Sequence, residues 1–537
     1  MKSTDSQFTN LRIYEFANLL RDLLAVFLLW VLVIACYWKI ALAGRVLAGG
    51  DVFTYFYPYW AEATRAMQAG RLPLWNPYLF MGVPFLANSQ VGVFYPLNWP
   101  LWFALPAHQS VQLTIVLHLC LAALGGYLWG RASLRLGRAG AWTVGAVFAL
   151  GGYLGAQVEH VNQLQGLAWL PLVLALCDKV LGLKSEVRSP ESEVRSPRSE
   201  VLGLRSGVAF VGLVVVVGLM LLAGHTQTAF ISLVGLAAYG LGPVLWQPCR
   251  FLARSGIARR GAPYGQDHLQ PPQEWWGILD RRAALLACAA GLGVALAAVQ
   301  LVPTWELTRL SVRAGGLPFN ERLSFSLSPL YLARALLPGF ATPVPPEHIE
   351  YVSYVGIAGL ALAAMGLFAN ARRQHRNRST NLPIYFLTFL GLFFSLGLYN
   401  PLYLLLARFV PGFAHFRVPA RWLALYAAGV AALAGAGADC LWRGRVRVRW
   451  RWVGVFALLV VGLGMWGALG GRVGRATLIG WVVGSVAVVG LLFVARRAPR
   501  LAAVGLLALL IVELFAASFA LPHARATAPQ AFTSLRP

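Results

Sequence analysis

Residues 49–100 read GGDVFTYFYPYWAEATRAMQAGRLPLWNPYLFMGVPFLANSQVGVFYPLNWP and lie between two long apolar runs. This stretch is too polar to lie in lipid, and it is too rich in Trp, Tyr, Phe and Pro to be a flexible linker. Aromatic residues collect at the boundary between membrane and water. We therefore expect an ordered extracytoplasmic loop on the bilayer surface, with Asp51 directly after the first span.

The composition of the chain is that of a membrane protein. Of its 537 residues, 58% are hydrophobic and 12% are charged, and the mean hydropathy is +0.63. These values exclude a soluble globule and predict an all-α polytopic membrane protein. The formal net charge is +25, but the basic residues stand in short clusters between apolar runs, a pattern that orients a membrane protein and does not indicate nucleic-acid binding.

Runs of about 18 to 22 apolar residues predict thirteen transmembrane helices. They span residues 23–43, 109–130, 139–156, 162–182, 206–223, 227–246, 283–303, 351–370, 381–398, 421–441, 452–470, 476–494 and 501–521. No small-residue cleavage site follows the first run, so we expect it to be a retained anchor and not a signal peptide.

The basic clusters predict which loops face the cytoplasm, because Lys and Arg concentrate on that side. The prediction is a cytoplasmic segment 1–22, a transmembrane domain 23–521 and a short extracytoplasmic tail 522–537. Within the domain, 44–108 is the first extracytoplasmic loop. Residues 183–205 include a repeat of SEVRSP and are expected to form a cytoplasmic low-complexity linker.

Asp51 is the candidate catalytic residue. It follows Gly49 and Gly50, which allow a sharp turn, and it precedes a run of aromatic residues. A carboxylate beside a partly dry aromatic surface is a plausible general base for a hydroxyl nucleophile. The alternative is that Asp51 only caps a short helix that begins at Val52.

The rest of the first loop offers side chains for contact with a sugar. Phenols, indoles and amides together suit stacking and hydrogen bonding to a sugar ring. The candidates are Tyr55, Tyr57, Trp75, Asn76, Asn88 and Gln90. The alternative is that Asn-Pro and Asn-Ser are ordinary turn formers.

Two further turns carry dense polar groups at the predicted outer boundary. Glu159 and His160 lie between the third and fourth spans, and His225 and Gln227 lie between the fifth and sixth. Polar residues at such positions often line a pocket. Helix capping and contact with lipid headgroups are the alternative, and the sequence favours neither.

A third outer segment, 415–422, reads HFRVPARW and places His415, Arg417 and Arg421 before the tenth span. Two guanidinium groups suit a phosphate because they donate paired hydrogen bonds at fixed charge. The alternative is that the arginines extend toward lipid headgroups. The sequence contains no Asp-x-Asp, HExxH or P-loop motif, so we predict neither a metal ion nor a cofactor.

Several of these motifs resemble one known family. GDVFTYFYPYW, GRLPLWNPYLFMGVPFLANSQ, GVFYPLNWP, GHTQTAF and FRVPARW are similar to segments of the YfhO family of bacterial membrane proteins, in the glycosyltransferase C superfamily. The resemblance covers most of residues 20–440. Many relatives continue into a sizeable extracytoplasmic domain after the last span, and the repeat at 185–201 is foreign to the family pattern.

The resemblance implies a bacterial inner-membrane enzyme that takes a sugar from a polyprenyl-phosphate donor. It implies an acceptor in the cell envelope (a polymer, lipid or protein), Asp51 as the residue that activates it, and a role for Arg417 and Arg421 at the lipid phosphate. One nearby carboxylate favours inversion at the sugar. The rival hypotheses are a flippase or exporter of a lipid-linked sugar, in which intramembrane residues such as Glu513 and His118 would take part, and a non-catalytic scaffold.

Overall fold

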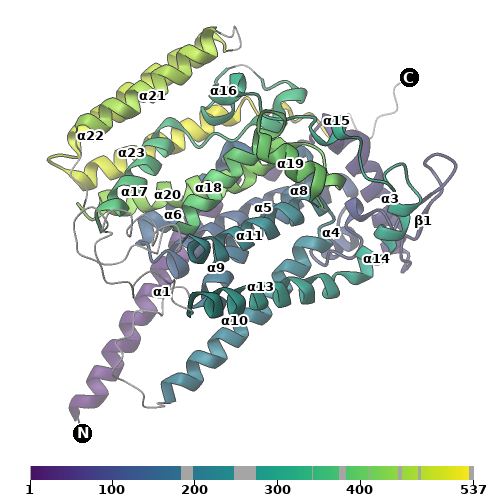
Figure 1. The fold of residues 1–537 in the computed structure, drawn as a ribbon, viewed down its shortest axis with the longest axis horizontal. Coiled ribbons are helices and arrows are strands. Elements are labelled where there is room, and N and C mark those ends of the chain that lie inside the picture. Colours follow the sequence, from purple (N-terminus) through teal and green to yellow (C-terminus); the bar gives the residue numbers. More distant parts are fainter. Residues whose placement is uncertain are drawn as a thin grey trace, which may run out of the picture.

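The computed structural model describes residues 2–182, 197–246, 274–341, 343–373, 382–410, 412–445, 450–469 and 473–530 (Figure 1). In these ranges the chain forms helices and one two-stranded antiparallel hairpin, β1 (Trp75–Asn76) with β2 (Val83–Pro84). The α-helices are α1 (Lys2–Cys36), α2 (Trp38–Ala41), α3 (Tyr57–Gln68), α4 (Trp99–Ala104), α5 (Ala107–Leu128), α6 (Arg138–Leu150), α7 (Gly152–Ala156), α8 (Val161–Leu167), α9 (Leu170–Leu181), α10 (Pro197–Leu222), α11 (Thr226–Leu245), α13 (Glu274–Leu296), α14 (Ala298–Arg309), α15 (Phe319–Arg322), α16 (Leu332–Leu336), α17 (Ile357–Arg373), α18 (Leu382–Ser395), α19 (Pro401–Phe409), α20 (Leu423–Trp442), α21 (Trp450–Leu469), α22 (Arg475–Val494) and α23 (Pro499–Ser518).

Short 3₁₀ and π turns connect these helices. They are η1 (Val52–Phe56), η2 (Ser89–Val91), η3 (Trp129–Ser133), η4 (Gln157–Glu159), η6 (Pro329–Tyr331), η7 (Pro346–Tyr351), η8 (Gly397–Tyr399), η9 (Phe413–His415), η10 (Pro419–Trp422) and η11 (Pro522–Arg525). Four of them, η1, η4, η7 and η10, carry or flank the candidate site.

Each of the thirteen predicted spans contains a helix, which confirms an all-α multi-pass membrane protein. Among the described residues, eight helical segments are long and apolar enough to cross a membrane, and a ninth counts if α13 and α14 form one bent span. The number thirteen stays a prediction. Residues 183–196 of the predicted linker and 531–537 of the predicted tail lie outside the described residues.

Two predicted spans differ in detail. The helix expected from residue 351 begins at Ile357, because residues 346–351 form the separate turn η7. The run 283–303 is not one straight helix, since α13 and α14 meet at 78°. Beyond the bend, Gln300 of α14 donates a hydrogen bond to the Leu86 carbonyl in the first loop, at 2.9 Å between Nε2 and O. The bend therefore brings α14 beneath that loop.

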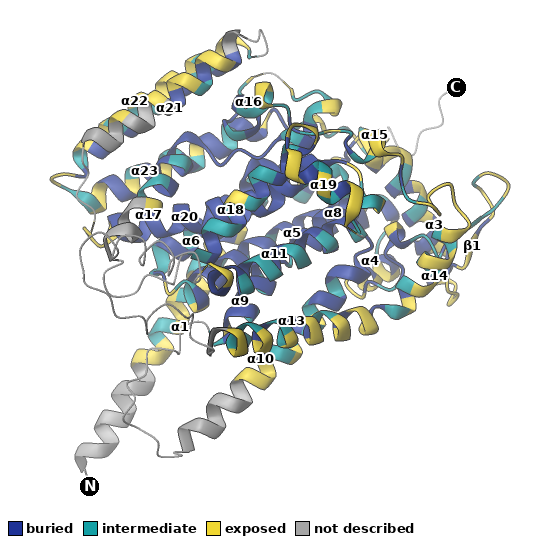
Figure 2. Ribbon diagram, viewed as in Figure 1, coloured by how far each residue is buried: buried dark blue, intermediate teal, exposed yellow. Residues whose placement is uncertain are grey.

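Helix α20 is the centre of the bundle and is fully buried along its apolar stretch (Figure 2). Its sequence, LALYAAGVAALAGAGADCLW, is rich in Ala and Gly, and small residues let neighbouring helices approach closely. A side chain at Gly437 would collide with the Leu362 carbonyl of α17, and one at Gly366 would collide with the Leu433 carbonyl. This close packing fixes α20, and the turn η10 directly before it carries Arg421.

Ion pairs connect helices and turns at the end of the bundle where α1 enters it. The Asp22 carboxylate lies 3.2 Å from Arg131 Nε and 2.9 Å from Arg138 Nε, and Asp439 lies 3.0 Å from Arg443 Nε. All five residues belong to segments that the charge pattern assigns to the cytoplasmic side. The first loop lies at the opposite end, with α3, β1 and α15 (Figure 1).

The first loop is ordered, as the sequence predicts, and helices, turns and the β1–β2 hairpin fill it. It is tied to the turn between α10 and α11, where Ser89 Oγ donates to the Gly224 carbonyl at 3.0 Å. Val46, near the start of the loop, forms an antiparallel bridge with Thr527, beyond the last long helix. Lys39 Nζ donates to the Ala524 carbonyl at 3.0 Å. The loop therefore has a fixed position over the bundle.

The arrangement predicts the outcome of cysteine labelling. Gln90 is exposed at the end that carries the first loop, and Arg497 is exposed between α22 and α23 at the other end. In a background without native cysteines, we expect Gln90→Cys to react with an impermeant maleimide in intact cells and Arg497→Cys to react only after permeabilisation. Labelling of both from the same side would overturn the assignment of sides.

Candidate functional site

Asp51 stands at the start of η1 and is accessible, with 59% of its side chain exposed. Its own backbone is helical, and its side chain makes no hydrogen bond that caps the helix. The structure therefore does not support the alternative in which Asp51 only caps the short helix that begins at Val52. Gly50 has a φ of +56°, and a side chain there would overlap the Glu159 carboxylate. The two glycines thus let the Asp51 turn lie directly against the turn that carries Glu159.

His160 is the ionisable partner of Asp51. Its Nε2 lies 3.4 Å from Asp51 Oδ2. The hydrogen bond from His160 lowers the pKa of the Asp51 carboxyl, partial burial opposes the shift, and the charges of His160, Arg421 and Arg417 lower the pKa further. Asp51 therefore stays an ionised carboxylate at pH values below the ordinary pKa of an aspartate.

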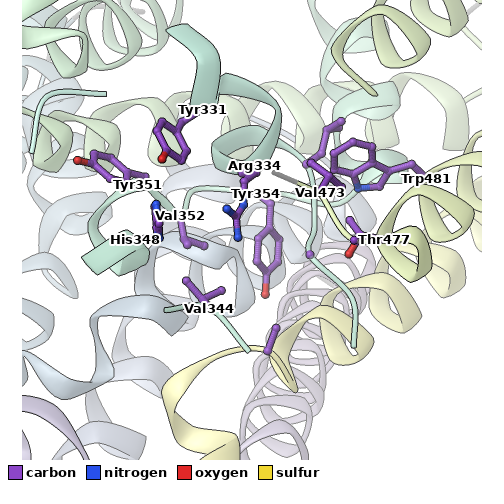
Figure 3. A pocket seen from close by; sticks show the side chains of 14 residues that line it. Tyr331, Arg334, Val344, His348, Tyr351, Val352, Tyr354, Val473, Thr477 and Trp481 are labelled. Atoms are coloured by element: carbon purple, nitrogen blue, oxygen red, sulfur yellow. The ribbon is translucent and has the colours of Figure 1, made fainter. Parts of the chain in front are cut away.

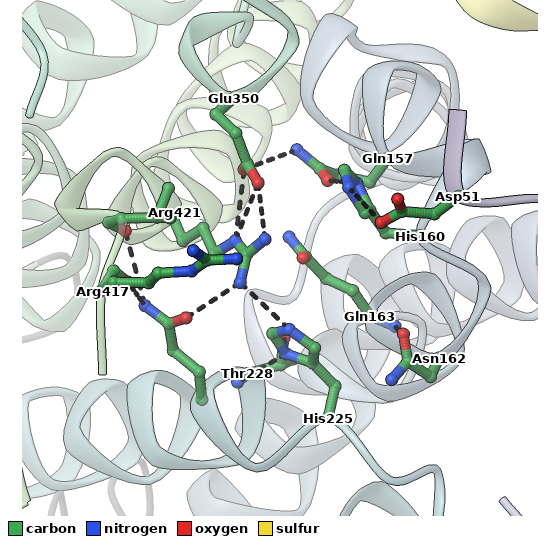
Figure 4. A network of polar contacts seen from close by, with 12 residues as sticks. Asp51, Gln157, His160, Asn162, Gln163, His225, Thr228, Glu350, Arg417 and Arg421 are labelled. Atoms are coloured by element: carbon green, nitrogen blue, oxygen red, sulfur yellow. Dashed lines mark hydrogen bonds and ion pairs between the residues drawn. The ribbon is translucent and has the colours of Figure 1, made fainter. Parts of the chain in front are cut away.

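Gln157 and Glu350 connect His160 to the rest of the site (Figure 4). Burial raises the pKa of the Glu350 carboxyl, but the Arg421 charge and hydrogen bonds outweigh burial and leave that pKa below its ordinary value. The ionised carboxylate only accepts hydrogen bonds, so the Gln157 amide nitrogen faces it, at 3.3 Å between Nε2 and Oε2.

This orientation of the amide determines which nitrogen of His160 carries hydrogen. The Gln157 amide oxygen, Oε1, lies 2.7 Å from His160 Nδ1. Because that oxygen can only accept, Nδ1 is the donor, and Nε2 is the nitrogen that faces Asp51. The hydrogen on Nε2 completes the contact with the Asp51 carboxylate.

Arg421 is held by a buried ion pair. Its guanidinium donates to both carboxylate oxygens of Glu350, with 3.0 and 3.2 Å from Nε and 2.5 Å from one terminal nitrogen. Only 14% of the Arg421 side chain and 9% of the Glu350 side chain are exposed. The other terminal nitrogen donates to Gln227 Oε1 at 2.9 Å and lies 3.2 Å from His225 Nε2. The guanidinium is thus already surrounded by acceptors.

His225 contributes a neutral ring to this network. Burial lowers the pKa of its imidazole well below the ordinary value, and the nearby Arg421 charge lowers it further. Its Nδ1 accepts from the Thr228 amide at 3.1 Å and lies 2.7 Å from Thr228 Oγ1, and its Nε2 lies 3.2 Å from the Arg421 guanidinium. His225 therefore caps the start of α11 and packs against Arg421 as an uncharged ring.

Arg417 differs from Arg421 although it lies only one turn away in sequence. Arg417 is exposed, and among the described residues its guanidinium has no hydrogen-bond or ion-pair partner. Its carbonyl accepts from Gln227 Nε2, and Val418 next to it has a φ of +63°, in the left-handed region. Figure 4 shows its side chain extending toward Arg421. Arg417 is thus the cation of this pair that remains available to a ligand.

Seven predicted site residues therefore gather at one place: Asp51, Glu159, His160, His225, Gln227, Arg417 and Arg421. Tyr55 borders the group, since the Asp51 charge contributes to raising its pKa, although burial is the main cause. Tyr55 also accepts a hydrogen bond from Asn88 at 2.8 Å, so these two predicted residues contact each other.

The remaining predicted residues have other surroundings. Tyr57 is fully buried within the fold. Asn76 is buried and accepts from the Tyr78 amide at 2.9 Å, the contact of an ordinary turn former. Trp75, Gln90 and His415 are exposed, and none of the three has a described contact with Asp51 or Arg421.

Glu350 and Gln157 are the functional residues that the sequence did not single out. Both are buried, and both are central to the network. Tyr153 joins them: its hydroxyl donates to the Arg421 carbonyl at 3.0 Å. Glu350 lies in a segment with no motif, 71 residues before Arg421, so no spacing rule predicted the pair.

Comparison with protein-family models gives no match, and comparison with curated proteins gives none either. Among solved structures, the chain is similar to ArnT from Cupriavidus metallidurans in the apo state, with a TM-score of 0.43 and 13% identity over 93% of this chain and 77% of that one. It is also similar to the Archaeoglobus fulgidus oligosaccharyltransferase in the apo form, with a TM-score of 0.40 and 14% identity over 92% of this chain and 56% of the other. The chain thus spans little more than half the length of that second protein.

Proposed function

We propose that the protein transfers a sugar from a polyprenyl-phosphate donor to an acceptor hydroxyl at the outer face of the bacterial cytoplasmic membrane. The acceptor class is an envelope polymer, lipid or protein. The observation that carries the proposal is the Asp51 carboxylate, which is accessible, held ionised and paired with His160. The guanidinium of Arg417, which has no partner in the part of the chain that the structure describes, supplies the opposite charge at the same site.

In the proposed step, Asp51 takes the proton of the acceptor hydroxyl as the hydroxyl oxygen bonds to the anomeric carbon. The bond between that carbon and the phosphate oxygen breaks, and its electron pair leaves with the lipid phosphate. A lowered pKa keeps Asp51 ionised but makes it a weak base. The proton therefore passes from Asp51 to water, to which 59% of its side chain is exposed.

The two arginines have separate roles in this mechanism. Arg417 donates to the departing phosphate, because its guanidinium is exposed and without a partner among the described residues. Arg421 is a positioning residue: with Glu350 it holds Gln157, and Gln157 orients His160. This assignment narrows the sequence-based prediction, which gave both arginines to the phosphate.

The stereochemical course is proposed to be inversion in a single displacement. Glu159 is a second carboxylate close to the Asp51 turn, as its contact with Gly49 and Gly50 indicates. It is packed against the glycine backbone, which favours a structural role and not that of a nucleophile. Nuclear magnetic resonance of the anomeric proton in the product distinguishes inversion from retention.

The transport hypothesis draws no support from the intramembrane residues that it would use. Glu513 Oε2 accepts from the Ala358 amide at 2.9 Å and so caps the start of α17. The His118 ring lies 2.7 Å from the Tyr95 hydroxyl and 2.7 Å from the Thr114 carbonyl. Both sets of contacts favour structural roles.

Reconstitution tests the proposal. The protein in liposomes is given a panel of polyprenyl-phosphate sugars and envelope acceptors, and the products are analysed by mass spectrometry. We expect an acceptor heavier by one sugar residue together with free polyprenyl phosphate. Movement of the intact donor across the bilayer with no new product would instead establish transport.

The acid limb of the pH–rate profile tests the role of His160. Because His160 lowers the pKa of Asp51, the wild-type carboxylate persists as the pH falls. In His160→Ala that pKa rises toward its ordinary value, so Asp51 becomes protonated at a higher pH. We expect the acid limb of kcat/KM to move to higher pH, whereas His108→Ala, a control at the same end of the bundle, leaves it in place. An unchanged limb in His160→Ala would exclude the proposed pairing.

A further inference from the structure

A cavity of about 140 Å³ lies between α16, η7 and the first turns of α22 (Figure 3). None of its lining residues belongs to the network around Asp51. Most of the lining is apolar, with Val344, Val352, Val473 and Trp481 among its residues. Its polar members are Tyr331, Arg334, His348, Tyr351, Tyr354 and Thr477.

Arg334 is the cation of this cavity, and it is partly buried. Among the described residues its guanidinium has no hydrogen-bond or ion-pair partner. Other partly buried arginines at this end are bonded: Arg322 donates to the Leu317 and Ala407 carbonyls, and Arg421 pairs with Glu350. Partial burial reduces the hydration of the Arg334 charge, so its position favours an anionic ligand.

No acidic side chain of the lining neutralises Arg334. The fourteen lining residues contain neither Asp nor Glu. The nearby Glu347 carboxylate is 66% exposed and lies 3.8 Å from His348 Nδ1. The cavity therefore keeps a positive side at Arg334.

The other side of the cavity is an apolar wall of aromatic rings. Tyr331 and Tyr351 stack with ring centroids 5.7 Å apart, and the His348 ring lies 5.1 Å from that of Tyr331. Stacked rings present an apolar surface of fixed shape. A ligand that fits both sides has a compact anionic group joined to a carbon skeleton.

We propose that this cavity binds a phosphate monoester, with the Arg334 guanidinium donating paired hydrogen bonds to the phosphoryl oxygens and the aromatic wall covering the esterified carbon unit. The planar fork of arginine matches two phosphoryl oxygens. The proposal does not depend on sugar transfer. The turn η7 connects the cavity with the network around Asp51, since His348 of η7 lines the cavity and Glu350 of η7 pairs with Arg421.

Calorimetric titration of the full chain in maltoside micelles tests the proposal. The probes are glycerol 3-phosphate and short-chain phosphatidic acid, which present the same phosphate monoester without and with acyl chains. We expect saturable binding to the wild type. Equal affinity for both probes indicates a water-soluble ester as the ligand, and tighter binding of phosphatidic acid indicates a lipid headgroup.

Variants of Arg334 separate the cavity from the general positive charge of the protein. Arg334→Met is expected to weaken binding by on the order of ten- to a hundredfold, since it removes charge-assisted hydrogen bonds. Arg334→Lys keeps the charge without the planar fork and gives an intermediate loss. Arg313→Met removes an exposed guanidinium at the same end and leaves binding unchanged, as does Asp51→Asn.

Three results would overturn the proposal: no saturable binding to the wild type, equal affinity in Arg334→Met, or an equal loss in Arg313→Met. Folding does not confuse the readout, because Arg334 has no partner among the described residues whose loss would destabilise the chain. Because Asp51→Asn keeps the cavity intact, failure of the proposed sugar transfer and failure of this proposal give different results.

Discussion

Asp51→Asn is expected to lower the rate of product formation by about 10²–10⁴-fold, the usual contribution of general-base assistance. The substitution keeps the size of the side chain and its capacity for hydrogen bonds, but the amide cannot take a proton. The measurement is the initial rate of sugar transfer in liposomes. The variant is expected to insert, fold and bind the donor normally, because Asp51 is exposed and makes no capping bond.

A matched control and two other hypotheses sharpen this experiment. Glu306→Gln neutralises an exposed acid at the same end of the bundle and should leave the rate near that of the wild type. A capping role for Asp51 would give near-normal activity in Asp51→Asn, because Asn caps helices as well as Asp. Near-normal activity would therefore rule out the mechanism proposed above, whereas transport would give no chemical product even in the wild type.

Glu350→Gln is expected to destabilise the protein by about 3–5 kcal/mol, because it leaves the Arg421 guanidinium buried without a counter-charge. The remaining partners of Arg421 are His225, which is neutral, and Gln227. Neither can replace the carboxylate. The measurement is the free energy of unfolding in mixed micelles, followed by tryptophan fluorescence.

The control for this variant lies on the same turn. Glu347→Gln removes an exposed carboxylate whose contact with His348 is 3.8 Å long, and we expect a change within about 0.5 kcal/mol. Removing both charges in Glu350→Gln with Arg421→Met should recover much of the stability, since the uncompensated charge is then gone. Equal stability of Glu350→Gln and Glu347→Gln would mean that the buried pair contributes little.

The sequence predicted the helical spans well because lipid requires long apolar runs, and a helix satisfies every backbone polar group within such a run. The charge pattern assigned Asp51, His160, His225 and Arg421 to one side, but it did not predict that their turns would meet. What it could not predict was where a span breaks. The 78° bend between α13 and α14 accompanies a contact between Gln300 of α14 and Leu86 of the first loop, two segments that lie far apart in the chain.

The division of labour between the two arginines was also beyond the sequence. A spacing of four residues suggests one fork, but burial decides that Arg421 is an internal ion-pair partner and Arg417 an accessible cation. The burial of Arg421 depends on its pairing with Glu350, and Glu350 belongs to a segment without any recognisable motif. A charge pair between distant segments leaves no local signal in either segment.

The contact between Lys39 and Ala524 bears on how the protein is made. These residues are 485 positions apart, and Val46 and Thr527 pair beside them. At about 5–20 residues per second, a ribosome needs roughly 25–100 s to travel from one to the other. During that time the segment before Asp51 has left the ribosome without the C-terminal residues Ala524 and Thr527, to which it later bonds. The nascent chain thus carries its acidic group early and completes the surroundings of that group only near the end of translation.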